Sequence, residues 1–284
     1  MDCYLSPEQI KEYTVETGIK KAENSLKKSF LLSFMGGMFI SLAAIGSLIA
    51  SCTIDNYSLS SLIAGIVFTA GLIMVVVAGA DLFTGNVLII LAVLQKRITA
   101  LKMVKNLVIT FLGNLIGALF IVFLVQGSGI LNNADGILVQ KLVLKAAHKI
   151  EYPFYQAFIL GILCNLLVSL AVWMTYSSKD TGGKVIVCMF PILLFIIGGY
   201  EHIVANMYYI PAGVIAAMSG NYASLSTVPS EVLSKLTLGG IIRNFIPVTL
   251  GNLIGGLVIG CVYANIYKSK SSLGEVVSKI KISA

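Results

Sequence analysis

The chain is organised as long runs of apolar residues separated by short polar segments. A membrane-crossing α-helix needs roughly 20 mostly apolar residues, and runs of this length recur along the sequence. They lie at residues 30–52, 62–94, 104–125, 154–176, 185–218 and 238–267. The pattern therefore predicts an all-α membrane protein with six transmembrane segments.

The second and fifth runs are too long for a single straight crossing. Each contains a polar patch with glycine, GADLFTGN at residues 79–86 and GYEHIVAN at residues 199–206, and glycine, an acid and asparagine keep the same spacing in both. A broken helix exposes backbone N–H and C=O groups that lipid cannot satisfy, so breaks occur where polar groups surround them. We therefore expect an interrupted helix at each patch.

The two halves of the chain repeat each other. The hexapeptide LGNLIG stands at residues 112–117 and again at 250–255, in the third run of each half. Because three crossings is an odd number, the second half enters the membrane from the opposite side, as in the inverted repeats of many transporters. The predicted fold is thus a 3+3 inverted repeat with halves at about 30–126 and 154–267. The glycines of the hexapeptide predict close helix packing.

Lysine and arginine are unequally distributed between the connecting segments. The N-terminal segment, the second and fourth loops and the C-terminal tail hold most of them. The positive-inside rule then places both termini in the cytoplasm, as in a multi-pass protein of a bacterial-type inner membrane. We divide the chain into a cytoplasmic interfacial helix within 1–29, a transmembrane domain at 30–268 and a cytoplasmic tail at 269–284. The helix is expected at about 7–28.

The composition excludes several classes of protein. Of the 284 residues, 57% are apolar and 12% are charged, and the mean hydropathy is +0.92. Soluble domains are about 45–50% apolar and about 25% charged, so a soluble enzyme, a nucleic-acid-binding protein and a disordered chain are excluded. The net charge of +7 lies in the loops and reports membrane orientation. The five cysteines lack metal-ligand spacing, so we expect no metal and no other cofactor.

Asp81 and Glu201 are the only acidic residues inside the apolar runs. Placing an ionisable group at the bilayer centre costs roughly 2.5–3.5 kcal/mol, so a carboxylate at this depth indicates a specific structural or functional role. We expect them to support the breaks by capping the N–H groups of the half-helices that follow. Those half-helices begin near Asn86 and Asn206 and point their positive N-termini at the membrane centre, which favours a path for an anion.

His202 is the only histidine within an apolar run, and pseudo-symmetry places it opposite Thr84. The favoured interpretation is a pore-lining hydrogen-bond donor that can exchange a proton, and the alternative is a buried packing residue. Lys149 lies at the predicted outer mouth of the fourth run, where it is either an anion-attracting group or a solvated loop charge. Asn165 is either part of the polar lining or an interhelical hydrogen-bonding residue.

At these residues the sequence resembles the formate/nitrite transporter family. The likeness covers roughly residues 8–268 and is specific at 79–86, 199–207 and 246–252. Within that family the chain is most similar to the hydrosulfide channel branch. The resemblance implies a homopentamer in a lipid bilayer, with an aquaporin-like pore in every protomer and no nucleic-acid partner.

The resemblance also implies roles for individual residues. A mobile loop at the first break would carry Leu82, Phe83 and Thr84, with Thr84 facing His202. Lys149 and Asn165 would belong to the polar lining of the outer vestibule. The apolar constrictions would be formed by Phe68, Leu72, Leu82 and Phe83 on the cytoplasmic side and by Phe195 on the outer side.

The predicted function is a channel for small monovalent weak-acid anions, with hydrosulfide first and formate and nitrite as related substrates. Apolar rings resist a bare ion because desolvation is costly, and between them Thr84 and His202 bind the anion. The first alternative is a proton-coupled formate or nitrite transporter. An intramembrane enzyme would need an HExxH motif or a serine elbow, and Ser219 sits in no such turn. A neutral-solute channel lacks support because the chain has no Asn-Pro-Ala pair.

Overall fold

The computed structural model describes residues 4–267 of the chain. Within this part the protein is built of helices, and its only β pairing is an isolated bridge between Tyr4 and Ser178. The tail predicted at 269–284 and Cys3 lie outside the described residues. The all-helical fold predicted by the sequence is therefore confirmed for the described part.

The helices follow one another along the chain with short connections. In chain order they are α1 (Pro7–Glu23), α2 (Leu26–Ser51), α3 (Tyr57–Ala78), α4 (Phe83–Asn86), η1 (Val87–Ile89), α5 (Ile90–Leu94), α6 (Ala100–Gly127), η2 (Ile130–Asn132), α7 (Ile137–Glu151), α8 (Phe154–Thr175), α9 (Thr181–Ile197), α10 (Ile203–Ser219), η3 (Ala223–Thr227), α11 (Ser230–Ser234) and α12 (Leu238–Ile266). The η elements are short 3-10 helices.

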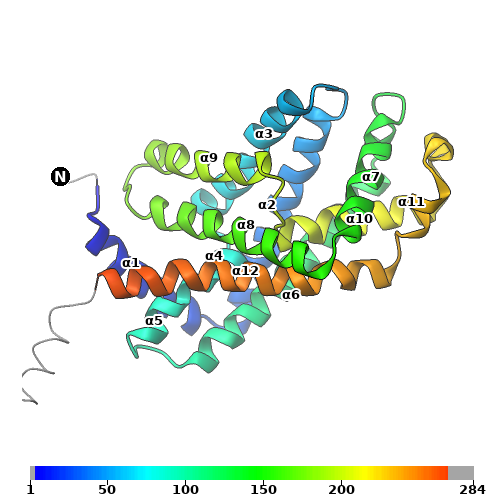
Figure 1. The fold of residues 1–284 in the computed structure, drawn as a ribbon. Coiled ribbons are helices and arrows are strands. Elements are labelled where there is room, and N and C mark those ends of the chain that lie inside the picture. The colour runs from blue at the N-terminus through cyan, green and yellow to red at the C-terminus, as the bar shows by residue number, and fades with distance from the viewer. Residues whose placement is uncertain (1–3, 268–284) are drawn as a thin grey trace, which may run out of the picture.

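Five of the described helices, α2, α3, α6, α8 and α12, are long and apolar enough to cross a membrane. Three shorter apolar helical stretches are also described, Phe83–Leu94, α9 and α10, and of these α9 and α10 follow one another and together make a sixth crossing. In Figure 1 these helices run alongside each other as one bundle. Helix α1 and the last residues of α12 lie at one end of the bundle, here called the α1 end, and α7 and α11 lie at the other, here called the α7 end.

Both long runs are interrupted at the predicted patches. Helix α3 ends at Ala78, and Gly79 follows with φ +82° in the left-handed region. Gly199 occupies the same place after α9, with φ +65°. A residue with a side chain pays roughly 1–2 kcal/mol for this conformation, so glycine fits both positions. The chain then resumes as α4 and as α10, whose N-termini both face the centre of the bundle.

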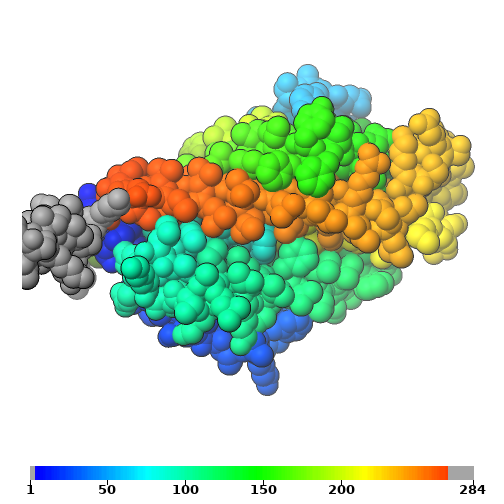
Figure 2. Space-filling view, turned by 60° about the horizontal axis from the view of Figure 1, so that its bottom comes forward, coloured from blue at the N-terminus to red at the C-terminus, as the bar shows by residue number. Residues whose placement is uncertain are grey.

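The glycines of the two hexapeptides lie where helix backbones approach each other. A Cβ added to Gly117 of α6 would collide with the carbonyl oxygen of Phe34 on α2, and one added to Gly255 of α12 would collide with the carbonyl oxygen of Ile162 on α8. The sequence prediction of close packing is confirmed. Figure 2 shows α12, in orange, running along the length of one face beside α6.

Helix α1 is shorter than the sequence predicts. It starts at the expected cap, where the Ser6 hydroxyl accepts from the Gln9 N–H and the Gln9 side chain returns to the Ser6 N–H. It ends at Glu23 rather than near residue 28, because Ser25 caps the start of α2. The turn between the two helices lays α1 across the α1 end of the bundle.

Candidate functional site

The first helix break is held by Asn114, the asparagine of the first hexapeptide. Its Oδ1 accepts from the backbone N–H of Phe83 at 2.9 Å, which satisfies the first free donor of α4. Its Nδ2 donates to the carbonyl oxygens of Asp81 at 2.9 Å and Ser33 at 2.7 Å. One buried amide therefore ties the break to α2 and α6.

Asn252 does the same for the second break. Its Oδ1 accepts from the N–H of Ile203 at 2.8 Å, and its Nδ2 donates to the carbonyl oxygens of Glu201 at 2.9 Å and Gly161 at 2.8 Å. The sequence analysis interpreted the hexapeptides through their glycines and missed both asparagines. The signal was available, because an identical polar residue recurs at the centre of two apolar runs.

The prediction that Asp81 and Glu201 cap the following half-helices is wrong. Each carboxylate instead forms an ion pair with a lysine, and among the described residues neither accepts from a backbone N–H. Asp81 Oδ1 lies 2.8 Å from Lys21 Nζ of α1, and Glu201 Oε1 lies 2.6 Å from Lys149 Nζ of α7. Two buried carboxylates at the breaks are thus neutralised by lysines from outside the spanning helices.

Amide side chains extend these ion pairs at the first break. Lys21 Nζ also donates to Asn86 Oδ1 at 2.7 Å, Asn86 Nδ2 donates to Asn106 Oδ1 at 2.9 Å, and Asn106 Nδ2 returns to the Lys21 carbonyl at 3.0 Å. We call Lys21, Asp81, Asn86 and Asn106 the first acid network. It joins α1, the break and α6.

The second break carries a matching set. Asn206 Nδ2 donates to Glu201 Oε2 at 2.6 Å and to Asn244 Oδ1 at 2.8 Å, and Asn244 Nδ2 donates to the Lys149 carbonyl at 2.7 Å. We call Lys149, Glu201, Asn206 and Asn244 the second acid network. Lys149 was expected as a charge at the mouth, but it is only 8% exposed and is paired with Glu201.

Lys21 stays protonated in this setting. Its burial acts to lower its pKa, but attraction to Asp81 and to Tyr176 and the bond to Asp81 outweigh the burial and raise the pKa above the ordinary lysine value. Helix α1 therefore presents a permanent positive charge to the first break.

Thr84 and His202 meet between the two breaks. Thr84 Oγ1 and His202 Nε2 lie 3.2 Å apart, and both residues are buried. His202 Nδ1 accepts from the backbone N–H of Ala205 at 3.2 Å, so the imidazole itself caps α10. Because Nδ1 is an acceptor, the ring hydrogen lies on Nε2 and is donated to Thr84. The Thr84 hydroxyl hydrogen is then free to be donated to a further acceptor.

Aromatic rings close one side of this pair. Phe68 of α3 and Phe195 of α9 pack edge to face with centroids 5.5 Å apart, and Phe195 stacks on His202 at 5.8 Å. Phe68 was expected beside Leu72 on the cytoplasmic side. It pairs with Phe195 instead, because it lies one turn deeper in α3 and meets α9 there.

Two other predicted residues lie elsewhere. Phe83 was expected in the constriction, but its ring packs edge to face on Phe111 of α6 at 5.6 Å and lines an apolar cavity of about 360 Å³ between α6 and α12. Asn165 was expected beside Lys149 at the outer vestibule. It is fully buried and donates to the carbonyl oxygens of Asn252 at 2.5 Å and Thr84 at 3.3 Å, which is the interhelical role.

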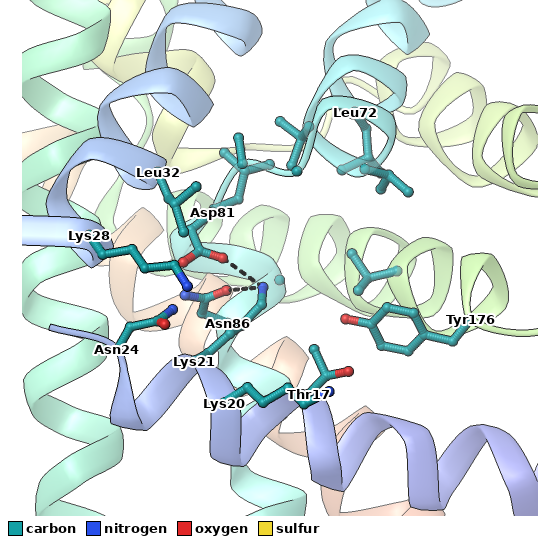
Figure 3. A pocket seen from close by; sticks show the side chains of 17 residues that line it. Thr17, Lys20, Lys21, Asn24, Lys28, Leu32, Leu72, Asp81, Asn86 and Tyr176 are labelled. Atoms are coloured by element: carbon teal, nitrogen blue, oxygen red, sulfur yellow. Dashed lines mark hydrogen bonds and ion pairs between the residues drawn. The ribbon is translucent and has the colours of Figure 1, made fainter. Parts of the chain in front are cut away.

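A cavity of about 410 Å³ lies at the α1 end, between Lys21 of α1 and the residues Asp81 and Asn86 of the first break (Figure 3). Leu72 and Leu82 lie on its inner wall, and Gly85 next to Thr84 also lines it. Its polar lining includes Thr17, Lys20, Lys21, Asn24, Lys28, Asp81, Asn86 and Tyr176. Three lysines face one aspartate, so the cavity carries an excess of positive charge that favours anions.

One family model and two named relatives match nearly the whole chain. The family model for formate/nitrite transporters matches residues 8–265. The chain is 37% identical over 269 residues to the formate channel FocA of Escherichia coli (strain K12), covering 93% of this chain and 94% of that protein. It is 36% identical over 278 residues to the formate channel BtFdhC of Bacillus thuringiensis, covering 95% and 98%.

Two solved structures are similar to this chain in fold. A structure titled as a pentameric formate channel with formate bound has a TM-score of 0.78 and 32% identity, and the match covers 86% of this chain and 98% of that one. A structure titled as an ion channel of the FNT family has a TM-score of 0.77 and 31% identity, with 89% and 97% covered. All four of these proteins are named as channels, and none is named as an enzyme. Within the described residues no cluster of three metal-binding side chains is present.

Proposed function

The chain belongs to the formate/nitrite transporter family, and from this premise we propose that it is a membrane channel for small monovalent weak-acid anions. The observation that carries the proposal is the hydrogen-bonded pair of Thr84 and His202, buried between the aromatic rings of Phe68 and Phe195 and the inner wall of a positively charged cavity. Those two side chains offer hydrogen-bond donors to an anion at a place where the surrounding apolar groups exclude water.

The mechanism starts at the charged cavity. Its lysines raise the local concentration of anions, and Leu72 and Leu82 on its inner wall resist a hydrated ion because desolvation is costly. At the centre the anion accepts a hydrogen bond from the Thr84 hydroxyl, and it can replace Thr84 Oγ1 as the acceptor of the hydrogen on His202 Nε2. The N-termini of α4 and α10 both face this point and add favourable dipoles.

Proton transfer from His202 is constrained by its second nitrogen. If Nε2 gives its proton to the anion, the ring stays neutral only when Nδ1 has gained a proton, and Nδ1 holds the N–H of Ala205. A proton-coupled transporter would therefore break the cap of α10 in every cycle. We propose that His202 acts chiefly as a neutral hydrogen-bond donor in a passive channel, and coupled transport is the alternative.

The proposal also ranks the candidate anions. Hydrosulfide, formate and nitrite are all weak-acid anions of suitable size, and the sequence analysis placed hydrosulfide first. The relatives at 36–37% identity are named as formate channels, which favours formate as the first anion to test. We also propose that the chain forms a homopentamer, as named for the structural neighbour, in a bacterial-type inner membrane with both termini in the cytoplasm.

The test is anion uptake into proteoliposomes that contain the purified protein. Each of formate, hydrosulfide and nitrite is supplied alone and in competition with the other two, across a pH series, with protein-free liposomes as control. We expect saturable, mutually competitive uptake of all three anions, with no uptake of glycerol. Uptake that matches the protein-free liposomes for every anion would overturn the proposal.

The same preparation separates channel from coupled transporter. A passive channel carries each anion down its own gradient and does not respond to an imposed proton gradient at fixed pH on the supply side. Accumulation of formate against its gradient, driven by the proton gradient alone, would support the coupled alternative.

A further inference from the structure

A second cavity lies at the α1 end, between the turn that joins α1 to α2 and the start of α6. We call it the turn cavity, and its volume is about 280 Å³. Its lining combines charged, amide and hydroxyl side chains with apolar ones: Lys21, Ala22, Glu23, Asn24, Leu26, Ser29, Lys102, Lys105, Asn106 and Ile109. Lys21 and Asn24 also line the charged cavity (Figure 3), so the two cavities adjoin at the turn. The proposed path of the anion does not use the turn cavity.

The turn cavity has one lysine whose charge is not matched by an acid. Lys21 is paired with Asp81, and Lys102 Nζ lies 3.3 Å from Glu23 Oε1. Lys105, an exposed residue of α6, forms no ion pair within the described part of the chain. The lining therefore carries one positive charge in excess, which suits a ligand with a single negative charge.

A buried hydroxyl at the turn cavity is free to bind the same ligand. Ser29 of α2 lines the cavity and is only 2% exposed. Its carbonyl accepts from the Ser33 hydroxyl and its N–H donates to the Ser25 carbonyl, but its own hydroxyl has no hydrogen-bond partner among the described residues. A buried hydroxyl without a partner is costly, and an anionic oxygen in the cavity would satisfy it.

Two long helices begin at the turn cavity. Leu26 is the first residue of α2, and Lys102 lies in the first turn of α6. The N-terminus of a helix carries a partial positive charge that favours anions, and phosphate in particular. The helix ends therefore act in the same direction as the unmatched Lys105.

The turn cavity also lies at the border between charged and apolar surface. Ile109 lines it seven residues beyond Lys102, which is roughly 10 Å further along α6 toward the middle of the bundle. Leu26 lines it from α2 and is largely exposed, and Val104 and Val108 are exposed beside it on α6. A ligand whose charged group meets Lys105 thus has an apolar surface next to it. This arrangement fits a lipid better than a free phosphate ion.

We propose that the turn cavity binds the headgroup of an anionic phospholipid. The phosphodiester contacts Lys105 and the Ser29 hydroxyl, and the acyl chains lie along the exposed apolar side chains of α6. The ligand class is a phosphodiester with one negative charge, such as phosphatidylglycerol. The orientation proposed above puts the α1 end on the cytoplasmic side, where the membrane surface is negative. This inference does not depend on which anion the channel carries.

The test titrates the purified protein in a neutral detergent with dioleoylphosphatidylglycerol and measures bound lipid by native mass spectrometry. The variants are Lys105→Gln, Lys105→Arg and the double variant Lys105→Gln with Ser29→Ala. Lys179→Gln is the matched control, because it removes an exposed lysine from the connection between α8 and α9 at the same end. Dioleoylphosphatidylcholine, which has the same acyl chains and no net charge, and inorganic phosphate are the comparison ligands.

We expect Lys105→Gln to weaken phosphatidylglycerol binding about fivefold, since one basic residue near an anionic lipid surface has an effect of this size. The double variant should bind more weakly still, and Lys105→Arg and Lys179→Gln should bind as the wild type does. Phosphatidylcholine should bind more weakly than phosphatidylglycerol to the wild type.

Three results would overturn the inference. The first is wild-type affinity for phosphatidylglycerol in the double variant. The second is an equal loss of affinity in Lys179→Gln, which would show a general attraction to charge at this end. The third is displacement of the lipid by inorganic phosphate at the same concentration, which would identify a site for free phosphate. Anion flux is not the measured quantity, so a failure of the proposed channel function would not be mistaken for any of them.

Discussion

At the scale of single residues, His202 combines two roles through its two ring nitrogens. Nδ1 accepts from the N–H of Ala205 and so fixes the ring, which leaves Nε2 to donate toward Thr84. Phe195 stacks on the ring, with centroids 5.8 Å apart. A backbone hydrogen bond thus sets both the tautomer and the direction of the donor that an anion would meet.

Thr84 offers a test of the hydroxyl alone. Thr84→Val keeps the shape of the side chain but removes its donor, and we expect anion flux to fall at least about tenfold, because a hydrogen bond to a charged group contributes about 1.5–3 kcal/mol. Thr84→Ser should retain most of the flux. Initial rates of formate uptake in proteoliposomes measure both, and equal rates for the two variants would contradict a role for the hydroxyl.

At the scale of elements, the breaks are stable because amides from neighbouring helices replace the missing helical hydrogen bonds. Asn114 and Asn252 each make three such bonds in the described part of the chain. The breaks themselves were predictable from glycine, an acid and asparagine at one spacing. The partners were not, because no local pattern says which side chain from another helix will reach a break.

Replacing Asn252 by alanine should destabilise the protein measurably. The N–H of Ile203 would lose its partner in the core, and an unsatisfied buried group costs about 1–3 kcal/mol. Asn265→Ala is the control, since this exposed amide of α12 bonds the Cys261 carbonyl and no other group in the described part of the chain. Thermal unfolding in detergent should give a clearly lower Tm for the Asn252 variant, and equal Tm values for the two variants would contradict the supporting role.

The packing of α8 on α12 can be tested through a glycine. A Cβ at Gly251 would collide with the Phe158 carbonyl, so Gly251→Ala must separate the helices and should cost about 1–3 kcal/mol. Gly127→Ala, with open space around its Cβ, is the control. Trp173 is the single tryptophan and stacks on Tyr263 across the same helix pair at 4.2 Å, so its fluorescence follows unfolding. An unchanged melting curve for Gly251→Ala would show that α8 and α12 are not tightly packed there.

At the scale of the whole molecule, the repeat is more complete than the apolar runs suggest. Lys21 of α1 and Lys149 of α7 occupy equivalent places, so the matching contacts begin at α1. The predicted division at residue 29 separates α1 from the half with which it shares these contacts. Sequence analysis could find the six runs and both acids, but not their lysine partners, because Lys21 and Asp81 meet only when α1 folds back across the bundle.

The orientation proposed from the positive charges can be tested by thiol labelling. Asn133 lies exposed in the connection before α7, at the end opposite α1. In a background with its native cysteines replaced, Asn133→Cys should react with a membrane-impermeant maleimide in intact cells. A cysteine placed at exposed Glu12 of α1 should react only after lysis. The reverse pattern would place both termini outside.

The central claim is that anions pass between Thr84 and His202, and its most direct test is formate flux through His202→Phe in proteoliposomes across pH 5 to 8. This variant keeps an aromatic ring against Phe195 but removes the Nε2 donor. We predict a large loss of flux relative to the wild type at every pH, because the variant lacks a neutral donor, with the folded oligomer retained on size-exclusion chromatography. Flux equal to the wild type at every pH would contradict the claim.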